Sequence, residues 1–233
     1  MQREICALFV ALIFVLVFTA PVYPADPSTV LDILLSNNKN FVSGIPNDPE
    51  DSRLQSIEYE LGTGAMAVVL MCSDSLPDPR VFLSHNNIVV VRAGGAVIKT
   101  AGLVPDDPIL GSIEFYPHVE NTPLVIVLGE EKCRLAQAVI DGAEAKGSVG
   151  AVFAPIRIGI TDATKAGVTG EVLATKATEA NVKRTVDRIR GTRFIIGPLV
   201  DSGRLEVVGA MFDRETQSVR IIYRPDHKAT GGE

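Results

Sequence analysis

The stretch Ala65-Met66-Ala67-Val68-Val69-Leu70-Met71 contains only apolar residues and lies between Gly64 and the polar segment Cys72-Ser73-Asp74-Ser75. A continuous apolar run of this length, bounded by Gly and Ser, favours a strand that is buried on both faces. Residues 88–91 and 124–128 form two further runs of the same kind. We therefore expect three buried strands in one sheet.

Segments with a helical pattern alternate with these strands. Residues 107–118 carry apolar residues at helical spacing, and residues 134–146 do so after the third strand. Residues 171–190 predict a longer helix with basic residues late in it, as the helix dipole prefers. Strands that alternate with helices indicate a parallel sheet covered on both faces. The sequence thus predicts an α/β fold with a parallel-centred sheet flanked by helices.

The remaining segments complete this prediction. Residues 27–44 read as an amphipathic helix that ends at a glycine. A polar loop at residues 47–53 and a short helix before Gly62 are expected next. Residues 149–168 are Gly-rich and weakly patterned, so we expect a loop with short apolar pieces there. Residues 205–223 predict a closing β-hairpin at the end of the domain.

The first 25 residues are typical of an export segment. Residues 5–20 form an apolar run of 16 residues after a basic residue, which is short for a membrane span of about 20. A signal peptide is therefore favoured, although Tyr23 is large for its place before a cleavage at Ala25, and an uncleaved anchor stays the alternative. We expect residues 26–233 to form one domain outside the cytoplasm, periplasmic or extracellular, touching a membrane only through an uncleaved anchor.

The composition excludes several classes of partner. The 233 residues carry a net charge of −6 without a cluster of Lys or Arg, which argues against nucleic acid and anionic membranes. Trp is absent and aromatic residues make up 6% of the chain, so a stacking platform for bases or sugars is not expected.

Two cysteines lie outside the export segment, at the ends of two predicted strands. Cys72 follows the first strand, and Cys133 follows the third and opens a helix. Parallel sheets place ligand sites at these carboxyl ends, and two thiolates with nearby carboxylates suit tetrahedral zinc. However, two cysteines so far apart match no short metal motif, and an oxidising compartment favours disulfides. Spacing alone therefore favours a disulfide or inert buried thiols over a metal site.

Five segments between roughly residues 30 and 224 carry, in the same order, the motifs of one enzyme family. They are Asn37-Asn38-Lys39-Asn40-Phe41-Val42-Ser43-Gly44, Met71-Cys72-Ser73-Asp74-Ser75, Val90-Val91-Arg92-Ala93-Gly94-Gly95, Ser112-Ile113-Glu114-Phe115 with the strand at 124–129, and residues 207–213. They resemble the Gly-Asn-x-Arg-Phe, Cys-x-Asp-Ser-Arg, Val-Val-Arg-Asn-Ala-Gly, Ser-Leu-Glu-Tyr with Gly-His-x-x-Cys, and Val-Gly-Ala-x-Tyr-Asp motifs of the β-class carbonic anhydrases. Five motifs in collinear order make chance similarity improbable.

The resemblance implies an enzyme that reversibly hydrates carbon dioxide to bicarbonate, in a homodimer or higher homo-oligomer. In the family, two Cys and one His hold zinc, which lowers the pKa of bound water to about 7. The fourth position takes water or the motif Asp, and an Asp–Arg pair otherwise holds that Asp away from the metal. Carried over by motif, Cys72 and Cys133 match the two Cys ligands, and Asp74 matches the motif Asp and is the expected catalytic residue.

Two departures from the family pattern bear on the chemistry. Glu130 stands at the ligand His and Leu76 at the motif Arg. A glutamate in place of a neutral histidine makes the ligand set net negative, which should raise the pKa of any bound water. Without Arg at position 76, Asp74 is free to bind the metal unless Arg80 or Arg134 replaces the guanidinium. The expected zinc ligands are therefore Cys72, Cys133, and Glu130 or Asp74.

Three functions follow from this reading. The leading hypothesis is an exported, zinc-dependent carbonic anhydrase with carbon dioxide and bicarbonate as substrates. The second is a catalytically silent relative that uses a metal or a disulfide only for structure. The third is an altered hydrolase that acts on another small cumulated substrate through the same zinc chemistry.

Overall fold

The computed structural model describes residues 25–47, 64–75, 78–83, 85, 87–96, 98 and 107–226. Residues 1–24 of the predicted export segment lie outside this part of the chain. The short helix expected before Gly62 also lies outside it. Within the described part, no helix combines the length and the apolar character needed to cross a membrane.

Within the described residues, five strands form one sheet in the order β2-β1-β3-β4-β5. They are β1 (Ala67–Cys72), β2 (Ile88–Ala93), β3 (Leu124–Glu130), β4 (Glu206–Phe212) and β5 (Val219–Tyr223). The first four are mutually parallel, and β5 pairs antiparallel with β4. Every residue of β1 and β3 is buried, as expected of strands covered on both faces. The parallel-centred sheet and the closing hairpin are thus confirmed.

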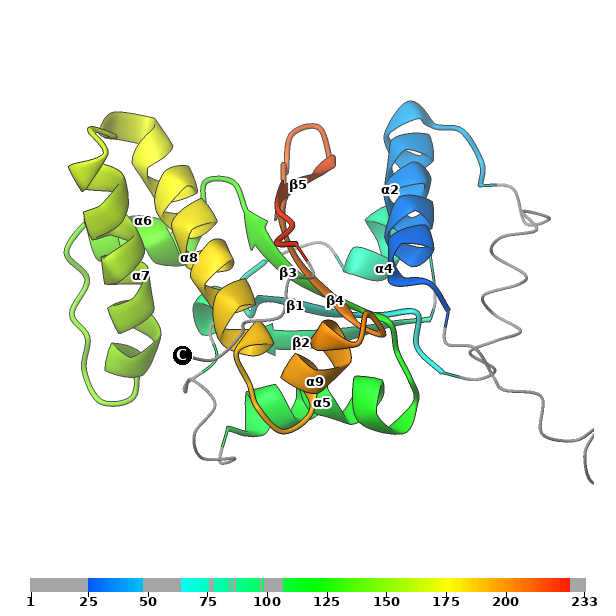
Figure 1. Ribbon diagram of the computed structural model, residues 1–233. Helices are drawn as coiled ribbons and strands as arrows, with labels where there is room; N and C mark the ends of the chain where they lie inside the picture. Colours follow the sequence, from blue (N-terminus) through cyan, green and yellow to red (C-terminus); the bar gives the residue numbers. More distant parts are fainter. Residues whose placement is uncertain are drawn as a thin grey trace, which may run out of the picture.

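Helices cover both faces of this sheet (Figure 1). They are α2 (Pro27–Ser43), α4 (Pro79–Phe82), α5 (Pro108–Val119), α6 (Arg134–Ile140), α7 (Val149–Lys165), α8 (Leu173–Arg190) and α9 (Ile196–Asp201), with 3₁₀ turns η1 (Gly94–Ala96) and η2 (Gly170–Val172). Side chains alternate along each strand, so Val69 packs toward α2 and Val68 packs toward α5, α8 and α9.

Two predictions around residues 140–168 were wrong. Residues 149–168 were expected to form a loop, but α7 occupies Val149–Lys165 and buries Phe153 and Ile156 on one face. Its glycines hid the helical pattern. Gly159 lets the helix approach α8, because a Cβ there would lie 2.5 Å from the carbonyl oxygen of Ala177. The preceding helix, α6, ends at Ile140 and not at residue 146.

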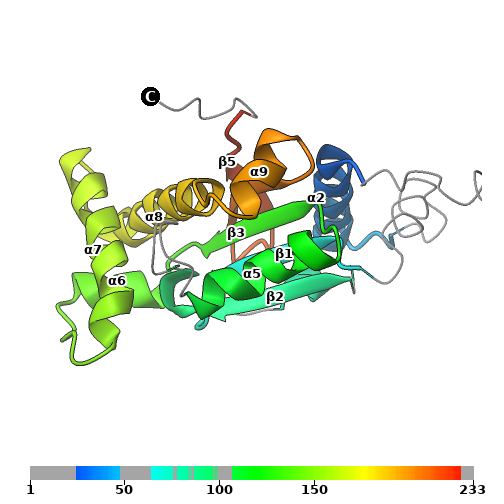
Figure 2. The ribbon, with the colours of Figure 1, turned by 60° about the horizontal axis from the view of Figure 1, so that its bottom comes forward.

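The carboxyl ends of β1 and β3 lie side by side at one edge of the sheet. Met71 of β1 pairs with Leu128 of β3. Cys72 is the next residue after Met71, and Glu130 is two residues after Leu128, so both lie at the same end of the sheet. Helices α6 and α7 lie beyond this edge, and α8 runs from there across one face of the sheet, as Figures 1 and 2 both show. The fold therefore brings the two predicted strand-end segments together.

Candidate functional site

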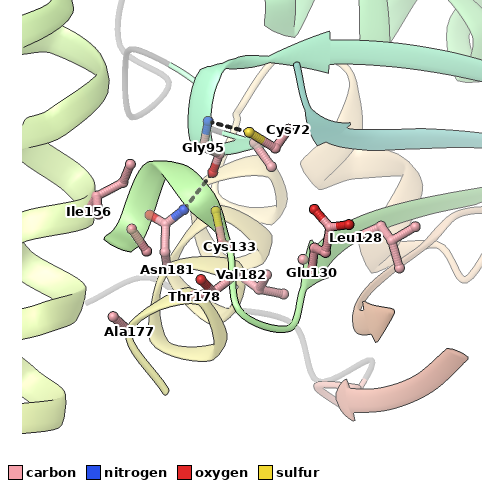
Figure 3. A pocket seen from close by; sticks show the side chains of 13 residues that line it. Cys72, Gly95, Leu128, Glu130, Cys133, Ile156, Ala177, Thr178, Asn181 and Val182 are labelled. Carbon is pink, nitrogen blue, oxygen red and sulfur yellow. Dashed lines mark hydrogen bonds between the residues drawn. The ribbon is translucent and has the colours of Figure 1, made fainter. Parts of the chain in front are cut away.

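Cys72 and Cys133 line one small cavity at this edge of the sheet (Figure 3). Cys72 is the last residue of β1, and Cys133 is the N-cap of α6. The cavity measures about 20 Å³ and is walled mainly by apolar side chains, among them Leu128, Ile156 and Val182. Both cysteines are buried and neither forms a disulfide. The structure thus brings together two free thiols beside a space of about one water molecule.

The two thiols differ in acidity, because each changes the pKa of the other. The hydrogen bond from Cys133 lowers the pKa of Cys72 to about 6, against the opposing effect of burial. The backbone N–H of Gly95, 3.3 Å from the Cys72 sulfur, stabilises the same thiolate. The shared hydrogen bond and burial raise the pKa of Cys133 above its ordinary value. The pair therefore loses its first proton more readily than an isolated thiol and its second proton less readily.

Backbone groups around Cys72 are held by two polar side chains. Arg92 donates from Nη1 to the carbonyl oxygens of Ser75, at 2.6 Å, and of Cys72, at 3.5 Å. Asn181 of α8 donates from Nδ2 to the carbonyl oxygen of Gly95 at 2.8 Å. Gly95 has a φ of +67°, which L-residues with side chains rarely adopt. Its N–H consequently faces the Cys72 sulfur while its carbonyl faces α8 (Figure 3).

Glu130 also lines the cavity, but its carboxylate is bound to other residues. The side chain is 4% exposed. Its Oε2 accepts a hydrogen bond from the Ser75 hydroxyl at 2.9 Å, and its Oε1 forms an ion pair with Nε of Arg214. In Figure 3 the carboxylate lies apart from both sulfur atoms. A buried carboxylate needs such partners, and here both oxygens have one.

Asp74 faces a neighbouring groove and not the cavity. This open groove of about 530 Å³ is lined by Asp74, Arg134 and residues of α6. Nε of Arg134 lies 3.5 Å from Oδ2 of Asp74. The other candidate guanidinium, that of Arg80, pairs with Asp78 at 2.6 Å. Arg134 therefore supplies the cation that Leu76 does not.

The four predicted ligands do not fit a metal ion in this arrangement. The two thiols come together, while Glu130 is bound by Arg214 and Asp74 is turned toward Arg134. Across the described part of the chain, no group of three or more His, Cys, Asp or Glu side chains could hold a metal ion. Zinc sites in proteins use three or four protein ligands. The arrangement supplies two, and the assignment of these residues to zinc stays a prediction.

Sequence reasoning did not find the partners of Glu130. Ser75 belongs to a motif that was noticed, but its hydroxyl had no assigned role. Arg214 lies in the turn between β4 and β5, 84 residues after Glu130. The one available signal was a basic residue directly after the terminal hairpin motif at 207–213.

A family model described as carbonic anhydrase matches residues 67–219, a range that begins at β1 and ends at the first residue of β5. The chain belongs to the carbonic anhydrase family. Among solved structures, the β-carbonic anhydrase of Coccomyxa in complex with acetazolamide has a TM-score of 0.60, with 16% identity over 84% of this chain and 83% of that one. This likeness confirms the β-class fold.

Two further proteins extend the comparison. "Carbonic anhydrase 2" of Mycobacterium tuberculosis is 26% identical over 216 residues, which cover 89% of this chain and 97% of the relative. The tetrameric β-carbonic anhydrases of Sordaria macrospora match with a TM-score of 0.58 and 15% identity, over 82% of this chain and 96% of theirs. The β-class carbonic anhydrase resemblance found in the sequence is thereby confirmed at the level of family and fold.

Proposed function

We propose that this protein keeps the fold and the thiol pair of a β-carbonic anhydrase but does not itself hydrate carbon dioxide. The observation that carries the proposal is the ion pair between Glu130 and Arg214. Glu130 stands where the family has its third zinc ligand, and its carboxylate is bound elsewhere. A catalytic zinc needs three protein ligands and an open position, so the two thiols alone do not build one.

The free energy of the Glu130 contacts indicates how firmly the carboxylate is held. Removing one partner of a buried ion pair costs about 3–5 kcal/mol, because the other charge is left uncompensated. Arg214 is partly exposed, with 42% of its side chain accessible, so the lower end, about 3 kcal/mol, applies. A metal bound to Glu130 would replace one cation with another, so this cost is the upper limit of the penalty, about 100-fold in metal affinity. This penalty favours a silent site over a working one.

The second candidate is zinc-dependent, reversible hydration of carbon dioxide to bicarbonate. The pair between Asp74 and Arg134 favours it, because an Asp held by a guanidinium beside the cysteines is a feature that the family resemblance implies for a working site. The free thiols of Cys72 and Cys133 favour it as well. In this candidate the two cysteines hold zinc together with Glu130 or Asp74.

Location and assembly belong to the same proposal. We propose that residues 1–25 direct export to the periplasm or the outside of the cell, as a signal peptide or an anchor. We also propose a homodimer or a higher homo-oligomer. The tetrameric state of the matched Sordaria macrospora proteins supports self-association of this chain.

One assay on the purified full chain separates the two candidates. After incubation with zinc and removal of the excess, bound zinc per chain and stopped-flow hydration of carbon dioxide are measured for the wild type and for Cys133→Ser. We expect no hydration above the buffer rate in either protein. Hydration that requires zinc and disappears in Cys133→Ser would overturn the proposal and establish the second candidate.

A further inference from the structure

We infer that Arg214 is a positioning residue that withholds Glu130 from the thiol pair, so that the β4–β5 turn sets the metal affinity of the site. The inference rests on the proposed function, because it explains why the third ligand position is out of use. It concerns the control of the site and not its turnover.

The turn that follows β3 is tied to the closing hairpin by three successive ion pairs. The pairs are Glu130–Arg214, Glu131–Arg220 and Lys132–Glu215. In addition, the backbone N–H of Glu131 donates to the carbonyl oxygen of Phe212 at 2.9 Å. The segment that should present the third ligand is therefore fixed to the hairpin along its whole length.

Only the first of these pairs involves a buried carboxylate. Glu130 is 4% exposed, whereas Lys132 and Glu215 are each more than 70% exposed. Exposed pairs contribute about 0–1 kcal/mol, while a buried carboxylate that loses its cation is left with an uncompensated charge. Among the three pairs, Glu130–Arg214 therefore decides where the carboxylate lies.

The position of Arg214 is set by the turn that carries it. The carboxylate of Asp213 accepts hydrogen bonds from the backbone N–H of Glu215, at 2.8 Å, and from the Thr216 hydroxyl, at 2.8 Å. Local bonds of this kind hold a turn in one conformation. The guanidinium is thus presented to Glu130 by the fold, without help from a ligand.

Arg214 opposes metal binding in two ways that act in the same direction. It occupies Oε1 of Glu130, and its positive charge also acts on Cys133 and Asp74. Removing the guanidinium would leave a buried carboxylate held only by Ser75, beside a cavity that already contains two thiols. A cation bound between the sulfurs would then be the nearest compensation for that charge.

The test measures metal affinity on the full chain, with Zn²⁺ in competition with a chelator and with Co²⁺ as a spectroscopic probe of coordination. Arg214→Met is expected to bind Zn²⁺ about 10- to 100-fold more tightly than the wild type, because Glu130 no longer has to leave its ion pair, and its Co²⁺ spectrum should gain tetrahedral intensity. Arg220→Met breaks a neighbouring pair of the same hairpin, and it should stay within about threefold of the wild type.

The double variant Arg214→Met/Glu130→Gln shows whether the gain passes through Glu130. We expect its Zn²⁺ affinity to fall back to within about threefold of the wild type. A gain that persists in the double variant, or no gain in Arg214→Met, would overturn the inference. Should Arg214→Met fail to fold, Arg214→Gln removes the charge that pairs with Glu130 but keeps a hydrogen-bond donor, and it is expected to tighten Zn²⁺ binding; unchanged affinity there would overturn the inference equally.

The inference and the proposed function can fail separately. The hydration rate of the wild type decides the proposed function. The ratio of metal affinities between the variants and the wild type decides the role of Arg214, whatever that rate is.

Discussion

Arg134, the first residue of α6, places its Nε 3.5 Å from Oδ2 of Asp74, which lies two residues after the end of β1. The family pattern takes this guanidinium from the residue two places after the Asp, where this chain has Leu76. The pair is largely solvent-exposed, with 74% of Arg134 and 33% of Asp74 accessible. Such a pair adds little to stability, so any contribution lies in the orientation of Asp74.

Removing Arg134 should therefore affect activity and not folding. In a Glu130→His variant that hydrates carbon dioxide, we expect Arg134→Ala to lower kcat about tenfold or more. The urea unfolding midpoint should stay unchanged, because the ion pair is exposed. Arg80→Ala is the matched control, since Arg80 pairs with Asp78. An unchanged kcat in Arg134→Ala would show that Asp74 needs no guanidinium from α6.

The unequal acidity of the two thiols predicts a pH-dependent ultraviolet signal. The hydrogen bond from Cys133 lowers the pKa of Cys72 to about 6, so thiolate absorbance of the metal-free protein should develop as the pH rises through about 6. Cys72→Ser should remove this step. Cys133→Ala should move it to higher pH, because the thiolate loses its main donor. Thiolate absorbance that develops only above pH 8 in the wild type would contradict the lowered pKa of Cys72.

The ion pair between Glu206 and Arg224 should contribute strongly to stability. Glu206 is 1% exposed and accepts bonds from two nitrogens of Arg224. Arg224→Ala leaves that buried charge without its cation, and we expect a loss of about 3 kcal/mol in the free energy of unfolding. Urea denaturation measures this loss. A loss below about 1 kcal/mol, the range of an exposed pair, would mean that solvent reaches Glu206.

Two glycines give a matched test of how α7 packs on α8. Gly159→Ala would place a Cβ 2.5 Å from the carbonyl oxygen of Ala177, so we expect a loss of about 1–3 kcal/mol. Gly111→Ala lies in α5 with no atom within 4 Å of the new Cβ and should gain about 0.5–1 kcal/mol. Thermal unfolding reports both changes. Equal effects of the two substitutions would argue against the close approach of the helices.

The sheet could be predicted from the sequence because its central strands are buried on both faces. Residues 67–72 and 124–128 show this as unbroken apolar runs, and strands that alternate with helices then place Cys72 and Cys133 at one edge. Helix α7 was missed because its apolar spacing is interrupted by Gly150, Pro155 and Gly159. Packing against α8 stabilises this helix, and a local pattern does not contain that information.

The charges of the site could not be paired from the sequence. Arg80 and Arg134 were equal candidates for the cation that pairs with Asp74. Arg134 reaches Asp74 because of the direction in which α6 starts after Cys133. Glu130 was expected to face the thiols because its position matches a ligand. The cation that pairs with Glu130 is Arg214, which follows β4 and comes 84 residues later in the sequence. Which cation reaches a buried carboxylate depends on tertiary structure.

The hydration rate of Glu130→His compared with that of the wild type tests the central claim most directly. Both full-length proteins are loaded with zinc and assayed by stopped flow at the same pH, with and without the additional substitution Leu76→Arg. The account predicts a wild-type rate equal to the buffer rate, a zinc-dependent rate in Glu130→His, and a higher rate in the double variant. A zinc-dependent wild-type rate above the buffer rate would contradict it.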